Sequence, residues 1–329
     1  MKNITIKIDK EQTIISLLKS NFNSTPLSLI YKLFRKKKVL VDSLPVRFYH
    51  HRVKKNSVIS ITDNSLVFNK KTKFIKPFEP NVEFKIVYED ENIIVVVKDH
   101  GIETHSKDFS SSLDNAVSYY LKDLPNFNKN RDLIVTSSHR IDKLTKGLVV
   151  YAKNSFVKVE FHKLFSKQGK IKKKYLAVCK GKVRQKLEDL IGEVNGFIFK
   201  DDLKQRMVFN FKSDDDKQDL KKCSMNVKKI FSRSNYFIFE IELYTGRKHQ
   251  IRSYFSSINL PIVGDKKYGS DIELQSKIKL FAYSIEFKDM PKELSYLNNL
   301  KLEIPIKKLL VSQISSLKEG ILPKKFIKY

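Results

Sequence analysis

The chain has 329 residues, with 64 Lys and Arg against 36 Asp and Glu, a formal net charge of +28. Such an excess of cations is typical of a polyanion binder, although a lysine-rich proteome would also raise it. Two cysteines at unrelated positions, Cys179 and Cys223, exclude a disulfide framework and argue against a structural zinc site, so we expect no metal. No segment predicts a signal peptide or a membrane span, which favours a cytoplasmic protein, in a bacterium rather than an organelle.

Residues 1–62 have the pattern of a small separate module. Hydrophobic periodicity predicts a strand near 4–6 and helices near 14–18 and 29–34. Short strands are predicted at 39–41 and 58–61. The module is therefore expected to be a compact α/β unit.

This module carries 13 Lys and Arg against 3 Asp and Glu. Lys32, Arg35 and Lys36 lie off the apolar stripe of the second predicted helix, so they are expected to face solvent. A basic helix face beside a hairpin suits an RNA backbone, and we predict that these three residues bind RNA. The alternative is an ordinary solvated helix face.

Residues 12–61 resemble the S4-type RNA-binding module of ribosomal proteins. The piece LSLIYKLFRKKKVLVDSLPV, at 27–46, is similar to the central motif of that module. The resemblance implies an S4-like RNA-binding domain over residues 1–62.

Residues 63–82 are polar, rich in lysine and interrupted by prolines, which indicates a linker. Beyond it, strand patterns and helical patterns are mixed. Strands are predicted at 84–88, 93–97, 147–152, 174–178, 207–211 and 236–243, and helices at about 111–121, 155–167 and 250–258. This mixture predicts an α+β fold over residues 83–315, followed by a basic tail at 316–329.

Residues 139–147 read HRIDKLTKG and lead directly into an apolar run. Asp142 is a single carboxylate between apolar segments, and burying it alone would cost free energy, so it must be exposed, paired or kept for a reaction. The alternative is an aspartate that only stabilises a turn. A second dense motif, TGRKHQIR, follows at 245–252. A lone acid and a distant arginine cluster in a very basic protein suggest an enzyme that acts on RNA.

The glycine-rich signatures of several enzyme classes are missing. Neither GxGxxG nor GxxxxGK[ST] occurs anywhere in the chain. These glycines shape the loops that bind dinucleotides and phosphates, so their absence argues against a dinucleotide-binding or methyl-donor fold of that type. We therefore expect no cofactor, and an RNA methyltransferase is disfavoured.

The stretch HRIDKLTKGLVVYAKN, at 139–154, closely resembles the catalytic motif of the RluA-type pseudouridine synthases. Four more segments resemble motifs of that family in the same order: YEDENIIVVVKDHGIETH (88–105), KKKYLAVCKGKV (172–183), LYTGRKHQIRSYFSSINLPIVGDKKYGS (243–270) and LFAYSIEF (280–287). The resemblance implies the pseudouridine synthase fold, with a mixed, mainly antiparallel central sheet and flanking helices. The N-terminal module points to the RluC/RluD branch, with RluC most similar, and hence to a monomer acting on large-subunit (23S) ribosomal RNA.

The resemblance also implies site residues. Asp142 is expected to be the catalytic carboxylate, Arg252 its ion-pair partner, and Tyr175 the ring that stacks on a flipped-out uracil. The residues alone leave open whether Asp142 attacks the base, attacks the sugar or removes a sugar proton. They also leave open whether Tyr175 is only a core aromatic, and whether the chain is a non-catalytic ribosome-assembly factor with the same fold.

Four further residues near these motifs are expected to contact RNA or orient the site. Arg140 is a candidate to fill the space left when a base leaves the stack. Arg247 is the candidate for a phosphate contact. His139 is also predicted to contact RNA. The alternative for His139, which applies to His249 as well, is that the side chain orients a neighbouring residue.

Overall fold

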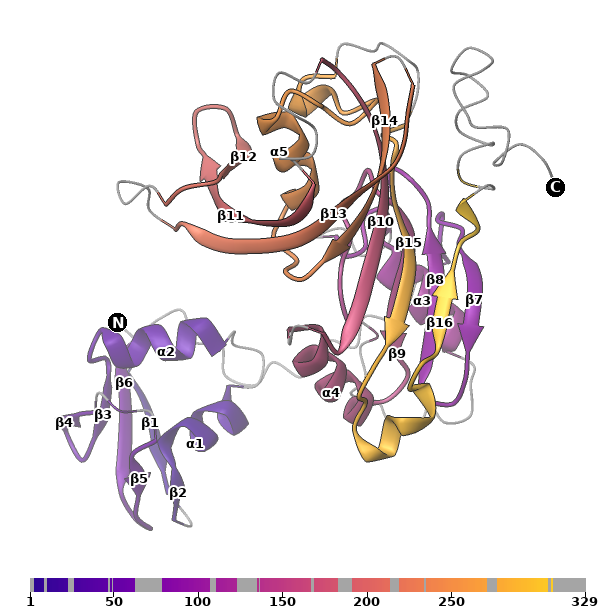
Figure 1. Ribbon diagram of the computed structural model, residues 1–329. Coiled ribbons are helices and arrows are strands. Elements are labelled where there is room, and N and C mark those ends of the chain that lie inside the picture. The colour runs from indigo at the N-terminus through magenta and orange to yellow at the C-terminus, as the bar shows by residue number, and fades with distance from the viewer. Residues whose placement is uncertain are drawn as a thin grey trace. The chain divides into compact units, whose positions relative to one another are not determined.

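The structure is a computed structural model that describes residues 3–8, 11–22, 27–46, 48, 50–62, 79–106, 111–122, 135, 137–166, 169–182, 191–213, 219–233, 235–270, 277–306 and 309. The chain divides into two compact units, Met1–Lys76 and Pro77–Tyr329 (Figure 1). This division falls within the predicted linker at 63–82, of which 63–78 lies outside the described residues. The predicted domain limits therefore stay a prediction, as does the basic tail at 316–329, which also lies outside them.

The N-terminal unit combines two helices with a small antiparallel sheet. Its elements are β1 (Asn3–Lys7), β2 (Gln12–Thr13), α1 (Ile14–Asn21), α2 (Leu27–Arg35), β3 (Val39–Val41), β4 (Leu44–Pro45), β5 (Arg52–Val53) and β6 (Val58–Thr62). Four strands pair in the order β1-β6-β3-β4, and β2 pairs with β5. Apolar residues of α1, α2, β3 and β6 form one core, which confirms the predicted helices and strands.

The C-terminal unit is built on one large sheet. Its strands are β7 (Lys85–Glu89), β8 (Ile93–Lys98), β9 (Lys146–Ala152), β10 (Ile171–Lys180), β11 (Gly192–Asp201), β12 (Arg206–Asn210), β13 (Lys221–Arg233), β14 (Tyr236–Leu243), β15 (Leu280–Phe287) and β16 (Lys301–Glu303). Its helices are α3 (Leu113–Leu121), α4 (Ser155–Ser166), α5 (Gln250–Ser257) and the 3-10 turns η3 (Lys266–Tyr268) and η4 (Lys292–Leu297). The α+β prediction is confirmed.

Nine of the strands follow the order β12-β11-β13-β14-β10-β15-β9-β8-β7, and β16 pairs with β15. All of these pairs are antiparallel except β9 with β15, so the sheet is mixed and mainly antiparallel, as predicted. Strands β11 and β13 were not predicted from periodicity. The long β13 alternates inward at Cys223, Met225 and Val227, but its register shifts between Lys229 and Phe231, which interrupts the pattern.

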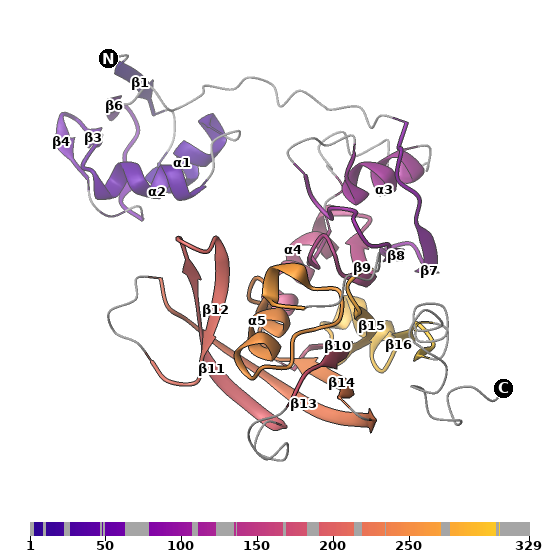
Figure 2. The same ribbon diagram turned by 90° about the horizontal axis from the view of Figure 1, so that it is seen from above.

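The two faces of the sheet carry separate cores, because successive strand residues point to opposite sides. Along β10, Tyr175 and Ala177 belong to one core, whereas Leu176 and Val178 belong to the other. Residues of α3 and α5 complete the first core, and residues of α4 and η4 complete the second. Figure 2 shows α5 lying along the β11–β13 part of the sheet. Tyr175 thus fixes which face can hold a site built around it.

Gly147 allows the parallel pairing of β9 with β15. Its φ is +149°, and a Cβ atom added there would lie 2.2 Å from the carbonyl oxygen of Ala282. Any larger residue would therefore push β9 away from β15 and displace the segment 139–146 that precedes it. None of the described helices is long and apolar enough to cross a membrane.

Candidate active site

A small pocket opens on the sheet face covered by α3 and α5. It is lined by Arg140, Ile141, Asp142, Thr145, Tyr175, Leu243, Gly246, Arg247, His249, Gln250, Ile251, Arg252 and Leu280. The three predicted catalytic residues all reach this pocket, Asp142 from the segment before β9, Tyr175 from β10 and Arg252 from α5. The fold therefore brings together residues that are up to 110 positions apart in the sequence.

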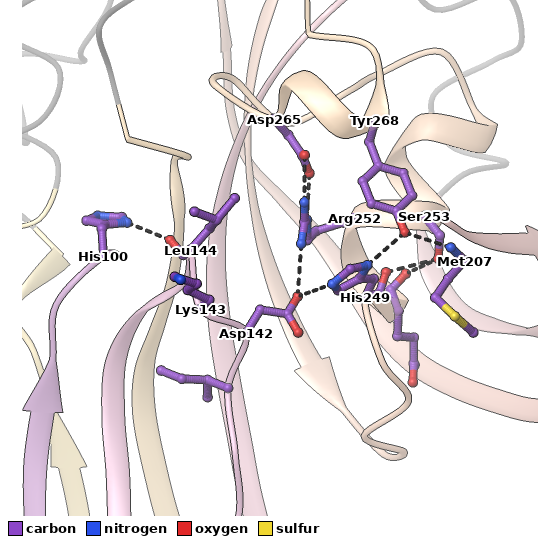
Figure 3. A network of polar contacts seen from close by, with 12 residues as sticks. His100, Asp142, Lys143, Leu144, Met207, His249, Arg252, Ser253, Asp265 and Tyr268 are labelled. Atoms are coloured by element: carbon purple, nitrogen blue, oxygen red, sulfur yellow. Dashed lines mark hydrogen bonds and ion pairs between the residues drawn. The ribbon is translucent and has the colours of Figure 1, made fainter. Parts of the chain in front are cut away.

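Asp142 lies at the pocket with 24% of its side chain exposed. The Nη1 atom of Arg252 donates a hydrogen bond to its Oδ2 atom at 3.4 Å, and Nε2 of His249 lies 3.8 Å from the same oxygen (Figure 3). The acid is thus neither buried alone nor free in solvent. Two nitrogens, from Arg252 and His249, face one of its oxygens.

Arg252 is itself held by a second carboxylate. Its Nε and Nη2 atoms donate to the two oxygens of Asp265 at 2.7 and 2.8 Å, and both side chains are almost completely buried. Burial lowers the pKa of Arg252, but the hydrogen bonds and charges of Asp265 and Asp142 outweigh it and leave that pKa above its ordinary value. A two-point pair of this kind fixes the guanidinium plane, so Arg252 reaches Asp142 from a rigid position.

The backbone around Asp142 is held by segment 98–104. The buried Nζ of Lys98 donates to the carbonyl of Lys143 at 3.0 Å, and Nδ1 of His100 lies 2.7 Å from the carbonyl oxygen of Leu144. Nearby donors from Gly101 and Thr104 also reach this turn. Burial lowers the pKa of Lys98 to about 7, although the charges of Asp142 and Asp99 oppose that shift. Four groups on one segment thus fix the turn that carries the acid.

Tyr175 is both a core aromatic and a residue of the pocket, the two interpretations that the sequence left open. Its ring is 7% exposed and belongs to the sheet core, and it also lines the pocket beside Asp142. Burial, and then the charge of Asp142, raise the pKa of its hydroxyl above the ordinary value. Tyr175 is therefore neutral at physiological pH and offers the pocket a ring held firmly by β10.

Two predicted RNA contacts, Arg140 and Arg247, are exposed residues at the pocket. Nε of Arg247 donates to the carbonyl of Lys222 at 3.0 Å, which orients its guanidinium. Lys32, Arg35 and Lys36 are also exposed, at the end of α2 in the N-terminal unit. Their accessibility is what an RNA contact requires.

The position of His139 favours the alternative role predicted for it, that of orienting a neighbour. Its ring stacks on Phe165 with centroids 4.5 Å apart, and its Nε2 accepts a hydrogen bond from the backbone N–H of Val150 at 3.2 Å. Burial, with a smaller effect from Lys173, lowers the pKa of His139 to about 3. A neutral ring engaged with β9 in this way supports the alternative role of orienting its neighbours.

His249 lies directly before α5 in the left-handed backbone conformation, with φ of 54°. Its Nδ1 is 3.0 Å from the hydroxyl of Tyr268, and that hydroxyl accepts a hydrogen bond from the backbone N–H of Met207 at 3.1 Å. The guanidinium carbon of Arg252 lies 4.9 Å from the centre of the Tyr268 ring. Tyr268 therefore contacts both residues that face Asp142.

Sequence reasoning missed Asp265 and Tyr268. Both lie in the segment PIVGDKKYGS, and Asp265 resembles Asp142 in being a single acid beside an apolar run. This pattern is the one feature of the sequence that could have indicated a role for Asp265. Within the part of the chain that the structure describes, no three His, Cys, Asp or Glu side chains cluster as a metal site would require.

Comparison with known proteins identifies the family. The family model for RNA pseudouridylate synthase matches residues 92–257. An uncharacterized RNA pseudouridine synthase of Mycoplasma capricolum is 35% identical over 302 residues, which cover 91% of this chain and 95% of that protein. The ribosomal large subunit pseudouridine synthase C of Buchnera aphidicola from Acyrthosiphon pisum is 31% identical over 278 residues, 83% of each chain.

The fold also matches a solved structure. Human RNA pseudouridylate synthase domain containing 4 superposes with a TM-score of 0.53 at 19% identity, over 71% of this chain and 93% of that one. That likeness shows the fold alone, whereas the sequence matches show the family. The chain belongs to the RluA-type RNA pseudouridine synthases, which are isomerases.

Proposed function

We propose that the protein converts specific uridines of large-subunit (23S) ribosomal RNA to pseudouridine, with Asp142 as the catalytic carboxylate. The observation that carries the proposal is the partly exposed Asp142 in a pocket between Arg252 and Tyr175. Relatives named as ribosomal large subunit pseudouridine synthases C and D support the choice of RNA. The reaction needs no redox agent, because the product is an isomer of the substrate.

The isomerisation breaks the bond between ribose C1′ and uracil N1 and forms a bond between C1′ and C5. The hydrogen at C5 leaves as a proton and N1 gains one, so atoms and charge balance. An ionised carboxylate can add to the nucleoside and leave again, or can accept a proton. Asp142 is suited to either task because it lies partly exposed at the pocket and Arg252 holds it in place there.

A uridine inside a helix cannot reach Asp142, so the target must turn out of its stack. The rigid Tyr175 ring supplies a face on which the extruded uracil can stack. Arg140 is exposed at the pocket and is suited to occupy the space left in the RNA. Arg247, also at the pocket, is suited to a phosphate contact.

The N-terminal unit completes the proposal as an S4-like RNA-binding module. Its cations Lys32, Arg35 and Lys36 are exposed, and its core is apolar. Phosphate contacts of this kind add affinity without requiring sequence recognition. We expect the protein to act as a monomer without a cofactor.

A non-catalytic assembly factor with the same fold is the second candidate. The site argues against it, because a protein that only binds RNA gains nothing from a carboxylate aimed at a polyanion. Arg252 and His249 both face that carboxylate from α5 or its start. Such an arrangement lowers the affinity for RNA, and a reaction that requires the acid explains why it is present.

The test is incubation of unmodified large-subunit RNA with the full chain, followed by mass measurement and pseudouridine-specific chemical labelling. Unchanged RNA mass with new labelled positions is expected. Asp142→Asn should lower the rate at least ~1,000-fold while RNA binding persists, because the nucleophile or base is lost. Asp289→Asn, which changes an exposed acid paired with Lys170, is the matched control and should keep full activity. Activity retained by Asp142→Asn would remove the assigned role.

A further inference from the structure

The two oxygens of Asp142 have different surroundings. Oδ2 faces Nη1 of Arg252 at 3.4 Å and Nε2 of His249 at 3.8 Å. Among the described residues, Oδ1 has no hydrogen-bond partner. Both nitrogens that approach the acid therefore face the same oxygen.

The direction of the hydrogen bonds behind His249 follows from the backbone. The N–H of Met207, on β12, can only donate, so the Tyr268 oxygen accepts from it at 3.1 Å. The hydroxyl has one hydrogen of its own, and the Nδ1 atom of His249 lies 3.0 Å away. Burial raises the pKa of Tyr268 to about 12, so this hydrogen is present at neutral pH.

The hydrogen of the His249 ring can lie on either nitrogen. Burial lowers the pKa of this ring to about 4 despite the opposing charge of Asp142, so it is neutral at pH 7 and carries one hydrogen. If Nδ1 held it, the Nε2 lone pair would point toward the carboxylate of Asp142 and repel it. If Nε2 holds it, Nδ1 accepts from Tyr268 and Nε2–H faces Oδ2. The second arrangement pairs Nδ1 with the Tyr268 hydroxyl and turns the Nε2–H toward Oδ2 of Asp142.

We infer that Tyr268 and His249 are positioning residues: Tyr268 keeps His249 in the form protonated on Nε2, and His249 together with Arg252 holds Oδ2 of Asp142 so that Oδ1 faces the nucleoside. This inference rests on the proposed function for its catalytic consequence. The hydrogen bonds themselves join β12, η3 and the start of α5, and the 3.8 Å contact of His249 with Asp142 extends them to the segment before β9 (Figure 3). These contacts exist whether or not the protein turns over RNA.

The direct test is nitrogen NMR of the full chain labelled with 15N-histidine at pH 7. The His249 signals are identified by their loss in His249→Gln. We expect the pattern of a ring protonated on Nε2, and in Tyr268→Phe a shift toward a mixture of the two tautomers. A wild-type ring protonated on Nδ1, or a pattern that Tyr268→Phe leaves unchanged, would overturn the inference.

Measurements of kcat and KM test the catalytic consequence of this positioning. Tyr268→Phe keeps the ring beside Arg252 and removes only the hydroxyl, so we expect kcat to fall about 10-fold with KM unchanged, as misplacement of a reacting group predicts. The matched control is Tyr283→Phe, which removes a tyrosine hydroxyl hydrogen-bonded to Glu240 on the opposite sheet face. Tyr283→Phe should leave kcat unaltered. An equal fall of kcat in both variants would reveal a general loss of stability and would refute the positioning role.

The outcomes separate this inference from the proposed function. A wild-type chain that makes no pseudouridine would refute the function, while the tautomer measurement would still decide the hydrogen-bond chain. An active wild type whose kcat is unaffected by both Tyr268→Phe and His249→Gln would refute the positioning role and leave the function intact.

Discussion

The two units of the chain use charge in opposite ways. In Met1–Lys76, every described residue that is buried is apolar, and the predicted RNA-binding cations are exposed. In Pro77–Tyr329, several charged side chains are buried. They are Lys98, Asp114, Arg252, Asp265 and Lys279. Exposed charge contributes affinity for a polyanion, whereas buried charge is retained only where it has a specific partner or task.

The buried charges near the pocket are all satisfied. Arg252 has both oxygens of Asp265, and Lys98 donates to three backbone carbonyls. Asp114, further along the same face, accepts from Tyr151. The difference between the units therefore predicts that neutralising a buried charge will damage stability and chemistry together, and that neutralising an exposed one will alter RNA affinity alone.

The largest expected effect comes from Arg252→Gln. It leaves the buried Asp265 without its two-point partner, so we expect a loss of about 3–5 kcal/mol in the free energy of unfolding, measured by urea denaturation. Activity should fall with it, because Asp142 loses Nη1. Asp265→Asn added to this variant should restore part of the stability, since the orphaned charge is then removed.

An exposed pair provides the control for that comparison. Lys163→Gln breaks the surface contact with Glu160 on α4 and should change stability by less than ~1 kcal/mol. A loss as large as that of Arg252→Gln would show that burial does not separate the two kinds of charge.

Lowering the pH should destabilise the C-terminal unit through its buried histidines. Burial lowers the pKa of His100, His139 and His249 to about 4, 3 and 4, below the unfolded value of 6.5. Between pH 6.5 and 4 the unfolded chain binds protons that the folded chain does not bind, so the free energy of unfolding falls as the pH falls. At pH 5 each histidine should cost roughly 2 kcal/mol relative to pH 7.

Thermal unfolding of the full chain at pH 7, 6 and 5, with hydrogen exchange to identify the unit that opens, measures this effect. Equal stability at pH 7 and 5 would contradict the assignment of neutral, buried rings.

The smallest expected effect is on affinity. Replacing Lys32, Arg35 and Lys36 together with Gln should weaken RNA binding about 10-fold and reduce the slope of log affinity against log salt by about 1 for each phosphate that is no longer neutralised. Because these residues belong to the other unit, kcat at saturating RNA should not change. Filter binding across a salt series and single-turnover kinetics measure the two quantities.

The matched variant replaces three exposed lysines of the C-terminal unit, Lys85, Lys292 and Lys301, with Gln. It removes the same total charge. If both variants weakened binding equally and lowered the salt slope equally, only the net charge would matter, and the N-terminal unit would lose its assigned role.

Much of the secondary structure could be predicted from hydrophobic periodicity. The helices α1, α2, α3, α4 and α5 and most strands were found because each buries one regular face. Strand β11 was missed because Gly196 occupies one of its buried positions without an apolar side chain. Strand β13 was missed because the register shift between Lys229 and Phe231 interrupts its apolar alternation. The parallel contact of β9 with β15 joins segments far apart in the chain, so no local pattern could reveal it.

The site was predictable in part. Asp142, Tyr175 and Arg252 could be named from motifs, but the role of His139 could not, because its stacking on Phe165 is a tertiary contact. Asp265 and Tyr268 lie in a motif that suggested no role for them, since a hydrogen-bond partner is chosen by packing rather than by spacing.

By itself, the sequence determined the α+β class and the family and singled out Asp142, which lines the pocket, because composition, alternation and motifs are local properties of the chain. Only the tertiary structure decided that Arg252 serves two carboxylates, that both nitrogens near Asp142 approach the same oxygen, and that one histidine faces the acid while the other supports a strand. Those outcomes depend on directions and distances between segments that meet only when β9, β10 and α5 pack around one pocket.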